Sequence, residues 1–306
     1  MAIEIVDSIG DDRVARVYIG SLDDGSKIEF VESTPSKDGI EDKWVLILST
    51  LKGCPVGCPM CDAGGDYGGT LSADEILEQI DHMVERRFPG GRIDSDKFKV
   101  QFARMGEPAF NDEVLNVMTE LPGRYDARGL NVSLSTIAPE GREEFFRDLI
   151  DVKNEFYRGR FQLQFSIHTT DPRKRDELIP CGKWSFERIA EYGNQFKKDD
   201  DKKITLNFIS FRDVRIDPDV LAKQFDPDTF LIKITPLNPT GKMKVNGLES
   251  GFDPDDPSGI TDLISDLESK GFEVILSIGN LEENRIGSNC GQYVDKNRER
   301  IIPGSG

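Results

Sequence analysis

The sequence predicts an α/β protein in which a parallel sheet is closed or partly closed into a barrel. Strand-like and helix-like segments alternate six times along the chain, an order typical of parallel strands joined by right-handed helical crossovers. The chain has 306 residues, of which 37% are hydrophobic, so it can bury the core that such a barrel requires. An antiparallel hairpin is expected ahead of the barrel.

Seven short segments rich in β-branched and aromatic residues are predicted to form strands. Each of them stands between turn-forming or strongly polar stretches, which sets its length. The predicted strands are Lys43–Thr50, Lys97–Ala103, Leu130–Ser135, Phe161–His168, Lys203–Ser210, Thr229–Thr235 and Phe272–Ser277.

Six helices are predicted between these strands. The clearest is Ser72–Arg87, because SADE at its start is a capping box and Ile76, Ile80 and Met83 recur at helical spacing. The other predicted helices are Asp112–Leu121, Glu140–Val152, Ser185–Phe196, Asp217–Gln224 and Gly259–Lys270.

The first 35 residues have a different pattern from the rest. RVARVYIG and SKIEFVES flank the turn-like SLDDG, which predicts an antiparallel hairpin. We therefore expect a hairpin extension over residues 1–35, the barrel over residues 36–280 and a C-terminal segment over residues 281–306.

Charge and hydropathy exclude several classes of protein. The 39 lysine and arginine residues against 56 aspartate and glutamate residues give a net charge of −17, which disfavours binding of nucleic acid by bulk charge. The basic groups 86–87, 173–175 and 296–300 are expected to be solvated surface. No run of about 18 apolar residues occurs, and the acidic N-terminus does not resemble a signal peptide. A cytoplasmic protein without contact to a membrane is expected.

Three of the five cysteines lie within eight residues. Cys54, Cys58 and Cys61 form C-x3-C-x2-C in a loop rich in proline and glycine, a spacing that can deliver three thiolates to three corners of a 4Fe-4S cluster. The fourth iron would then be open to a small molecule. A structural zinc site is the alternative, but it usually has a second cysteine pair or histidines, and His82 and His168 lie far away in sequence.

Other polar groups follow the predicted strands, where the loops of a barrel carry its chemistry. Gly106 and Glu107 stand in RMGEP, and the Glu107 carboxylate could accept a hydrogen bond from an ammonium group. Ser135, Ser166 and His168 stand at the ends of the next two strands, where they could hold ribose and carboxylate oxygens. Each of these residues alone could instead be an ordinary polar group of a loop or core.

Seven motifs in order resemble those of the radical S-adenosylmethionine superfamily, and within it the RNA methyltransferases of the RlmN and Cfr type, which methylate C2 or C8 of adenine. The resemblance extends from Arg16 to Tyr293 and rests on DGSKIE, CPVGCPMC, RMGEPAFN, SLSTIAP, FSIHTTDPRKRDELIP, ITPLNP and NCGQY. It implies a partial (β/α)6 TIM-like barrel, a 4Fe-4S cluster and S-adenosylmethionine as cofactors, RNA as substrate, and an electron donor such as flavodoxin or ferredoxin.

The resemblance also implies roles for single residues. Cys290 in NCGQY would carry a methyl group from the cofactor to the substrate ring, and Glu29 would accept a proton from the substrate adduct. Asn238 in PLNP joins Gly106, Glu107, Ser135, Ser166 and His168 as a cofactor-binding residue. From the residues alone, Cys290 could be a buried small hydrophobe, Glu29 an edge-strand surface acid and Asn238 part of an Asn-Pro turn.

Two features depart from the family pattern. The family has a second reactive cysteine seven residues before the first cluster cysteine, where this chain has Ile47. Cys181 in the IPCGKW loop could substitute for it, or could be a plain loop cysteine. The chain also begins almost at the hairpin, where the family has a helical domain that helps to hold RNA.

These departures and the acidity keep two alternative functions open. One is radical chemistry on a small molecule or a protein. The other is a cluster-bearing or zinc-bearing binding protein without catalysis, which would cleave no cofactor.

Overall fold

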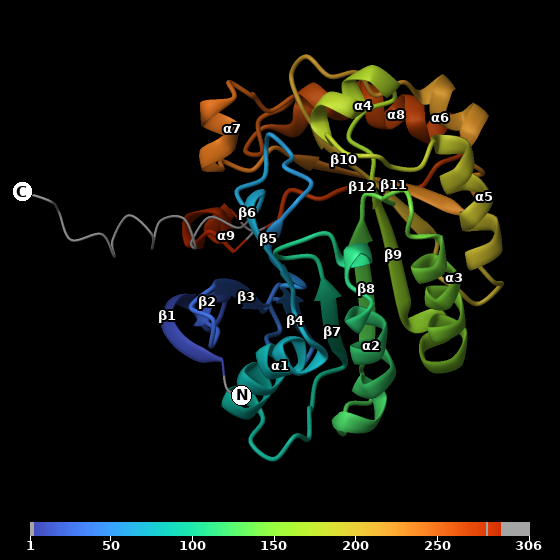
Figure 1. Ribbon diagram of the computed structural model, residues 1–306. Helices are drawn as coiled ribbons and strands as arrows, with labels where there is room; N and C mark the ends of the chain where they lie inside the picture. The colour runs from blue at the N-terminus through green and yellow to red at the C-terminus, as the bar shows by residue number, and fades with distance from the viewer. Residues whose placement is uncertain (1–2, 280, 289–306) are drawn as a thin grey trace, which may run out of the picture.

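A ten-stranded sheet forms the centre of the computed structural model, which describes residues 3–279 and 281–288 (Figure 1). The strand order is β1-β2-β3-β4-β7-β8-β9-β10-β11-β12. All neighbours from β4 to β12 pair in parallel. The parallel strands are β4 (Lys43–Leu48), β7 (Lys97–Phe102), β8 (Asn131–Thr136), β9 (Phe161–Ser166), β10 (Ile204–Ser210), β11 (Phe230–Pro236) and β12 (Val274–Leu276). The α/β fold class is confirmed, and each of the seven predicted strands is present.

The N-terminal strands continue this sheet in the antiparallel sense. β2 (Ala15–Ser21) pairs with β3 (Lys27–Ser33) as the predicted hairpin, and β3 pairs with β4. A further strand, β1 (Glu4–Asp11), pairs with β2 and was not predicted. None of its residues is buried, so it lacks the hydrophobic signal on which the prediction of strands depends.

A separate two-stranded sheet frames the cysteine loop. It consists of β5 (Leu51–Cys54) and the glycine-rich β6 (Gly65–Thr70), which pair antiparallel. The sequence analysis predicted neither the separate sheet nor β6, because β6 exposes five of its six residues and contains three glycines, which disfavour strands.

The six predicted helices are all present and cover the outside of the parallel sheet (Figure 1). Ser72 caps the first of them, and the reciprocal bond between the Ser72 backbone and the Glu75 side chain completes the predicted capping box. These helices are α1 (Ala73–Arg87), α2 (Glu113–Arg124), α3 (Glu143–Val152), α5 (Phe186–Phe196), α6 (Pro218–Gln224) and α8 (Thr261–Ser269). Three shorter helices were not predicted, namely α4 (Pro172–Leu178), α7 (Gly241–Val245) and α9 (Leu281–Ile286).

The parallel strands β7 to β11 each have one apolar and one more polar face. On β7, Phe98, Val100 and Phe102 are completely buried in the hydrophobic core. Side chains alternate along a strand, so Lys99 and Gln101 lie on the opposite face, which forms the inside of the barrel. The inside is therefore lined largely by polar side chains.

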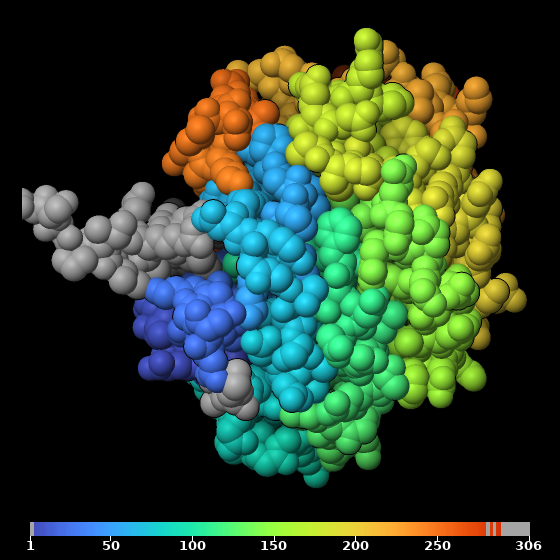
Figure 2. Space-filling view, viewed as in Figure 1, coloured from blue at the N-terminus to red at the C-terminus, as the bar shows by residue number. Residues whose placement is uncertain are grey.

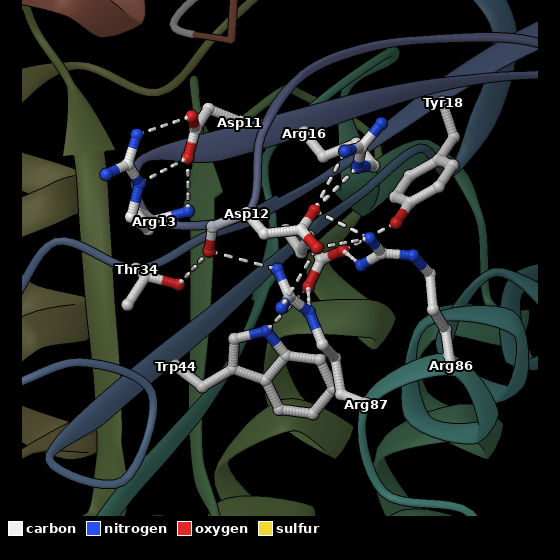
Figure 3. A network of polar contacts seen from close by, with 10 residues as sticks. Asp11, Asp12, Arg13, Arg16, Tyr18, Thr34, Trp44, Arg86 and Arg87 are labelled. Carbon is white, nitrogen blue, oxygen red and sulfur yellow. Dashed lines mark hydrogen bonds and ion pairs between the residues drawn. The ribbon is translucent and has the colours of Figure 1, made fainter.

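A network of polar contacts around a buried carboxylate connects the N-terminal strands to α1, and Figure 3 labels Tyr18, Trp44, Arg86 and Arg87 of this network. Glu32 is 1% exposed, and its oxygens lie 2.7 Å from Arg86 Nη1 and 2.7 Å from Arg87 Nε. Tyr18 donates its hydroxyl proton to the same carboxylate over 2.5 Å, and the Trp44 indole donates over 3.1 Å. Four donors on one carboxylate give it the partners that burial of a charge requires.

Asp12 extends this network to the turn between β1 and β2. It lies 2.6 Å from Arg86, 2.9 Å from Arg16 and 3.5 Å from Arg87. Figure 2 shows the N-terminal strands lying directly against the segment that leads from β4 into α1. The expectation that Arg86 and Arg87 form a solvated basic surface is wrong, because two carboxylates neutralise them.

The expectation of a solvated surface is also wrong for Arg175. This residue of α4 is 4% exposed and donates to the Trp184 carbonyl over 2.7 Å. Its guanidinium lies 5.2 Å from the ring centroid of Phe186.

Among the described residues, no helix is long and apolar enough to cross a membrane.

Removal of the Glu32 carboxylate should destabilise the fold strongly. We expect Glu32→Ala to lower the free energy of unfolding by about 3–5 kcal/mol, because two guanidinium groups would lose their buried partner. Urea denaturation followed by circular dichroism measures this loss. Asp11→Ala is the matched control, since the ion pair of Asp11 among the described residues is with the exposed Arg13, and its midpoint should stay near that of the parent. Equal midpoints for the two variants would contradict this role of Glu32.

Candidate functional site

A cavity of about 400 Å³ opens at the carboxyl ends of the parallel strands. Its size is typical of sites for small molecules and cofactors. Nine of the twelve residues that the sequence analysis singled out line it. They are Cys54, Cys58, Cys61, Gly106, Glu107, Ser135, Ser166, His168 and Asn238.

The three clustered cysteines face this cavity from the loop between β5 and β6. Burial raises the pKa of Cys54 to about 12 and also raises the pKa values of Cys58 and Cys61. Since the thiolate is the metal ligand, binding of a metal here must release protons. Within the described residues, no group of three or more metal-ligating side chains is arranged around a single ion. Three thiols spread around one cavity fit a multi-iron cluster, in which each cysteine binds a different iron.

The cysteine loop is held by the segment after β11. Thr240 Oγ1 donates to the Met60 carbonyl over 2.8 Å, and Asn246 Nδ2 donates to the Pro59 carbonyl over 2.9 Å. In the opposite direction, the Asp62 carboxylate accepts from the backbone N–H groups at the start of α7 over 2.8 and 3.0 Å. Thr240, Asn246 and Asp62 were not singled out from the sequence, although Thr240 directly follows the ITPLNP motif and Asp62 directly follows the CPVGCPMC motif.

Glu107 is held on the cavity wall by three donors. Its Oε1 accepts from Thr136 Oγ1 over 2.5 Å and from the Ala109 N–H over 3.1 Å, and its Oε2 accepts from the Ile137 N–H over 2.9 Å. Burial nevertheless raises the pKa of Glu107 to about 7. A carboxylate offers about four acceptor positions, so Oε2 keeps one for a further donor.

Gly106 occupies a position that no other residue could take without displacement of its neighbours. Its φ is +95°, and a Cβ atom there would lie 2.4 Å from two side-chain atoms of Leu51. The close approach brings the chain before Glu107 against the first residue of β5. It thereby joins the RMGEP loop to the strand that leads into the cysteine loop.

His168 is a neutral hydrogen-bond donor to the cavity. Burial and the nearby Arg175 lower its pKa to about 3, so the imidazole carries no charge at neutral pH. Its Nδ1 accepts from the Ile209 N–H over 3.2 Å, and the proton is therefore on Nε2. The φ of +65° is rare for histidine, and backbone strain of this kind is concentrated at functional positions.

Several polar side chains complete the inner wall of the cavity. Ser135 Oγ accepts from Gln164 Nε2 over 3.1 Å, and both residues line the cavity together with Asn207 and Lys233. The sequence analysis did not single out Gln164, Asn207 or Lys233. These three residues could have been found from the alternation of polar and apolar residues within the strands, which a search for motifs does not use.

Glu29 lies behind the cavity wall and is connected to it by Arg104. The expectation that Glu29 could be an edge-strand surface acid is wrong, because the residue is completely buried. Its Oε1 lies 2.8 Å from Nε of Arg104, which lines the cavity. The same guanidinium donates to the Gly287 carbonyl over 2.9 Å and to the Ser288 carbonyl. Arg104, which the sequence analysis missed, thus joins β3 to the C-terminal segment.

Cys181 lies beside the cysteine loop. It packs on the apolar cluster that contains Val56, Met60 and Ile179, and its charge state influences the pKa of Cys58. Burial raises the pKa of Cys181 itself. Cys290 and the basic residues 296–300 lie outside the described residues.

Comparison with known proteins identifies relatives that are named as RNA methyltransferases. A protein named probable dual-specificity RNA methyltransferase RlmN from Mycolicibacterium vanbaalenii is 28% identical over 214 residues, which cover 65% of this chain and 55% of that protein. A protein named ribosomal RNA large subunit methyltransferase N from Nitrosopumilus maritimus is 26% identical over 251 residues, which cover 78% of this chain and 68% of that protein. A protein named dual-specificity RNA methyltransferase RlmN from Helicobacter hepaticus is 30% identical over 202 residues, which cover 63% of this chain and 48% of that protein. The resemblance to the RlmN type is thus confirmed, and this chain spans roughly half to two thirds of these relatives.

A solved structure supports the fold. The crystal structure of a radical SAM methyltransferase from Sphaerobacter thermophilus matches with a TM-score of 0.73, over 95% of this chain and 81% of that one. At 19% sequence identity, this match establishes the partial barrel and not the activity. No protein-family model matches the chain.

A methyl group at position 106 should disturb the site and the fold together. We expect Gly106→Ala to lower the free energy of unfolding by about 1–3 kcal/mol, because its Cβ would overlap Leu51. Guanidinium denaturation measures the change. Gly123→Ala in α2 is the control, because a Cβ at Gly123 meets nothing within 4 Å and should leave stability unchanged or higher. A Gly106→Ala variant as stable as this control would rule out the proposed overlap.

Proposed function

We propose that this chain is a radical S-adenosylmethionine methyltransferase that transfers a methyl group through Cys290 to an sp² carbon, with adenosine in RNA as its favoured substrate. The observation that carries the proposal is the single cavity lined by three cysteines, Glu107, His168 and the strand-end polar residues. The names of the relatives, which are RNA methyltransferases, support the choice of reaction and substrate.

Cys54, Cys58 and Cys61 would hold the 4Fe-4S cluster as thiolates. When bound, the cluster supplies the electron for reductive cleavage of S-adenosylmethionine. With three ligands from the protein, one iron would remain open to the cofactor. Contacts from Thr240, Asn246 and Asp62 fix the backbone of this loop, which keeps the thiols in position before the cluster binds.

The cavity wall offers acceptors and donors that match an amino acid joined to a nucleoside. Glu107 Oε2 has an acceptor position left for the ammonium group, and a charge-assisted bond there would be strong. His168 Nε2 offers a donor, and Ser135, Ser166 and Asn238 offer hydroxyl and amide groups for ribose and carboxylate oxygens.

Cys290 would act near Arg104 and Glu29. Arg104 binds the carbonyls of Gly287 and Ser288, which are the residues shortly before Cys290 in sequence, and these contacts support the assignment. Arg104 would then be a positioning residue that holds both the C-terminal segment and the Glu29 carboxylate. Glu29 would accept the proton that the substrate ring loses.

Cys181 would release the covalent adduct in place of the absent cysteine at Ile47. Attack of the Cys181 thiolate on the Cys290 sulfur would form a disulfide and break the bond from that sulfur to the substrate's methylene carbon, which would take up a proton and become the product methyl group. The position of Cys181 next to the apolar cluster at the cavity edge supports this role, because it is on the same side of the barrel as the cysteine loop.

Loss of one cluster ligand should abolish the iron-sulfur chromophore. We expect Cys54→Ala, Cys58→Ala and Cys61→Ala each to lose the brown absorbance after anaerobic reconstitution, because a cube held by only two thiolates is labile. Iron and sulfide analysis of each variant measures this. Cys181→Ala is the matched control and should retain four irons per chain. Full iron content in all three ligand variants would rule out this site for the cluster.

The methyl relay should be visible on the Cys290 peptide. We expect the anaerobic protein with dithionite and S-adenosylmethionine to form 5′-deoxyadenosine and S-adenosylhomocysteine, and mass spectrometry to find a methyl group on Cys290. Cys290→Ala should form no product, whereas Cys181→Ala should accumulate a covalent substrate adduct.

The alternatives give different outcomes in the same experiment. Formation of 5′-deoxyadenosine without methylation of Cys290 would indicate radical chemistry on another substrate. Absence of both products with the cluster intact would indicate a binding protein. Normal turnover by Cys181→Ala would show that Cys181 is not the residue that releases the adduct.

A further inference from the structure

The inside of the barrel below the cavity is lined by lysines. Lys43 is the first residue of β4 and pairs in register with Lys97, the first residue of β7. Lys99 lies two residues further along β7 on the same face. Lys233 lies on β11 and lines the cavity. Three strands thus direct ammonium groups toward the same space.

A fifth lysine joins this group from the loop before β10. Lys202 Nζ donates to Asn131 Oδ1 over 2.9 Å, and Asn131 pairs in register with Lys99. Lys202 therefore reaches the face that carries Lys99. The five residues Lys43, Lys97, Lys99, Lys202 and Lys233 are called the lumen lysines below.

Four of the lumen lysines make no side-chain hydrogen bond or ion pair within the part of the chain that the structure describes. They are Lys43, Lys97, Lys99 and Lys233, and of these Lys43 is influenced by two carboxylates at longer range. By contrast, Arg86, Arg87 and Arg104 are all held by buried carboxylates. In a chain with a net charge of −17, acidic partners are abundant, so a group of unpaired lysines inside the barrel requires an explanation.

The lumen lysines also act on one another. Burial, followed by the charges of the other four lumen lysines, lowers the pKa of Lys99 to about 7. Since β7 and β11 are separated by three strands in the sheet, the influence of Lys233 on Lys99 acts across the inside of the barrel. The acidic groups that oppose this effect are Asp42 and Glu283, and both act on Lys43. An anion placed between these lysines would be bound by several unneutralised charges at once.

The barrel has an open side through which a ligand could reach these groups. β12 is an edge strand that pairs only with β11. Its Ile275 pairs in register with Lys233 and is 41% exposed, so the face that carries Lys233 is open to solvent at this edge. Lys97 is exposed as well. The lumen lysines are thus accessible although Lys99 and Lys233 are partly buried.

We propose that the lumen lysines form a phosphate-binding site that holds the RNA backbone beside the target nucleotide. The substrate class rests on the proposed function above, whereas the anion site rests on the contacts of these lysines alone. Phosphate is the anion that several lysines bind well, and RNA carries one at each nucleotide. Lys233 belongs to the lumen lysines and also lines the cavity. When the base of a nucleotide enters the cavity, the phosphates of that nucleotide would therefore point toward the lysines.

The site accounts for binding of RNA by an acidic protein. A small number of desolvated lysines can attract phosphate locally although the whole surface repels it. The acidic surface would then weaken unspecific binding, while the lumen lysines would select RNA that can enter the barrel.

The test compares two pairs of substitutions that change the charge equally. Lys99→Met with Lys233→Met removes two lumen lysines, and Lys198→Met with Lys223→Met removes two exposed ones. Binding of a fluorescent single-stranded RNA to the full chain is measured by anisotropy at 50–200 mM salt, with no cofactor present. We expect at least a tenfold loss of affinity and a salt slope lower by about 2 for the lumen pair, and less than twofold loss for the surface pair.

Additional measurements distinguish a loss of RNA binding from a loss of folding, and they distinguish RNA phosphate from free phosphate as the ligand. Lys99→Arg with Lys233→Arg should retain RNA binding, because it keeps both charges. The methionine pair should melt no lower than the parent, since it removes mutual repulsion; if it does not fold, the single variant Lys233→Gln replaces it. Inorganic phosphate should compete with RNA on the parent and raise its melting temperature, but not that of the lumen pair.

The outcomes are distinguishable from those of the enzymatic test. Equal RNA affinity of the lumen pair and the surface pair would overturn the proposal. A phosphate effect that depends on the lumen lysines, with unchanged RNA affinity, would also overturn it and would indicate a small phosphorylated ligand. Loss of RNA binding in the lumen pair would support the site even if no methyl transfer occurred, because the measurement requires neither cluster nor turnover.

Discussion

The alternation of side chains along the parallel strands is the constraint on which the rest of the molecule depends. One face of each strand must be apolar to bury the helices, as Phe98, Val100 and Phe102 do on β7. The other face is then free to carry polar groups, because helices cover only the outside of the partial barrel. The cavity, its hydroxyl and amide groups and the lumen lysines all lie on that second face. A one-residue shift in register would exchange the two faces and remove the core and the site together.

Much of the fold could be predicted because its elements carry local signals. The capping box at Ser72, the aspartate caps of short helices and the β-branched runs each identify one element without reference to the others. The strands β1 and β6 could not be found in this way. They are largely exposed and one is glycine-rich, so they form because neighbouring strands offer hydrogen-bond partners and not because of their own composition.

Residues of the candidate site could be predicted where a sequence motif contains them. They could not be predicted where they come together only in the folded structure. Cys54, Glu107 and His168 stand in recognisable sequence patterns and line one cavity. Arg104 stands in such a pattern too, but its importance comes from Glu29 and Ser288, which are far away in sequence. The lumen lysines were missed for a related reason. They are spread over four parts of the chain, whereas the visible basic runs at 86–87 and 175 are the ones that the fold neutralises.

The contacts of Arg104 have a consequence for the order of events during synthesis. This guanidinium connects β3 with carbonyls 183 and 184 residues further along the chain, so the connection has a very high contact order. Contacts of such separation form late, after the shorter ones have reduced the cost of closing the loop. On the ribosome, the barrel and its cysteine loop can fold while the last residues are still in the exit tunnel. The C-terminal segment is therefore secured only after the rest of the molecule, and until then the Arg104 guanidinium lacks the carbonyl acceptors of Gly287 and Ser288.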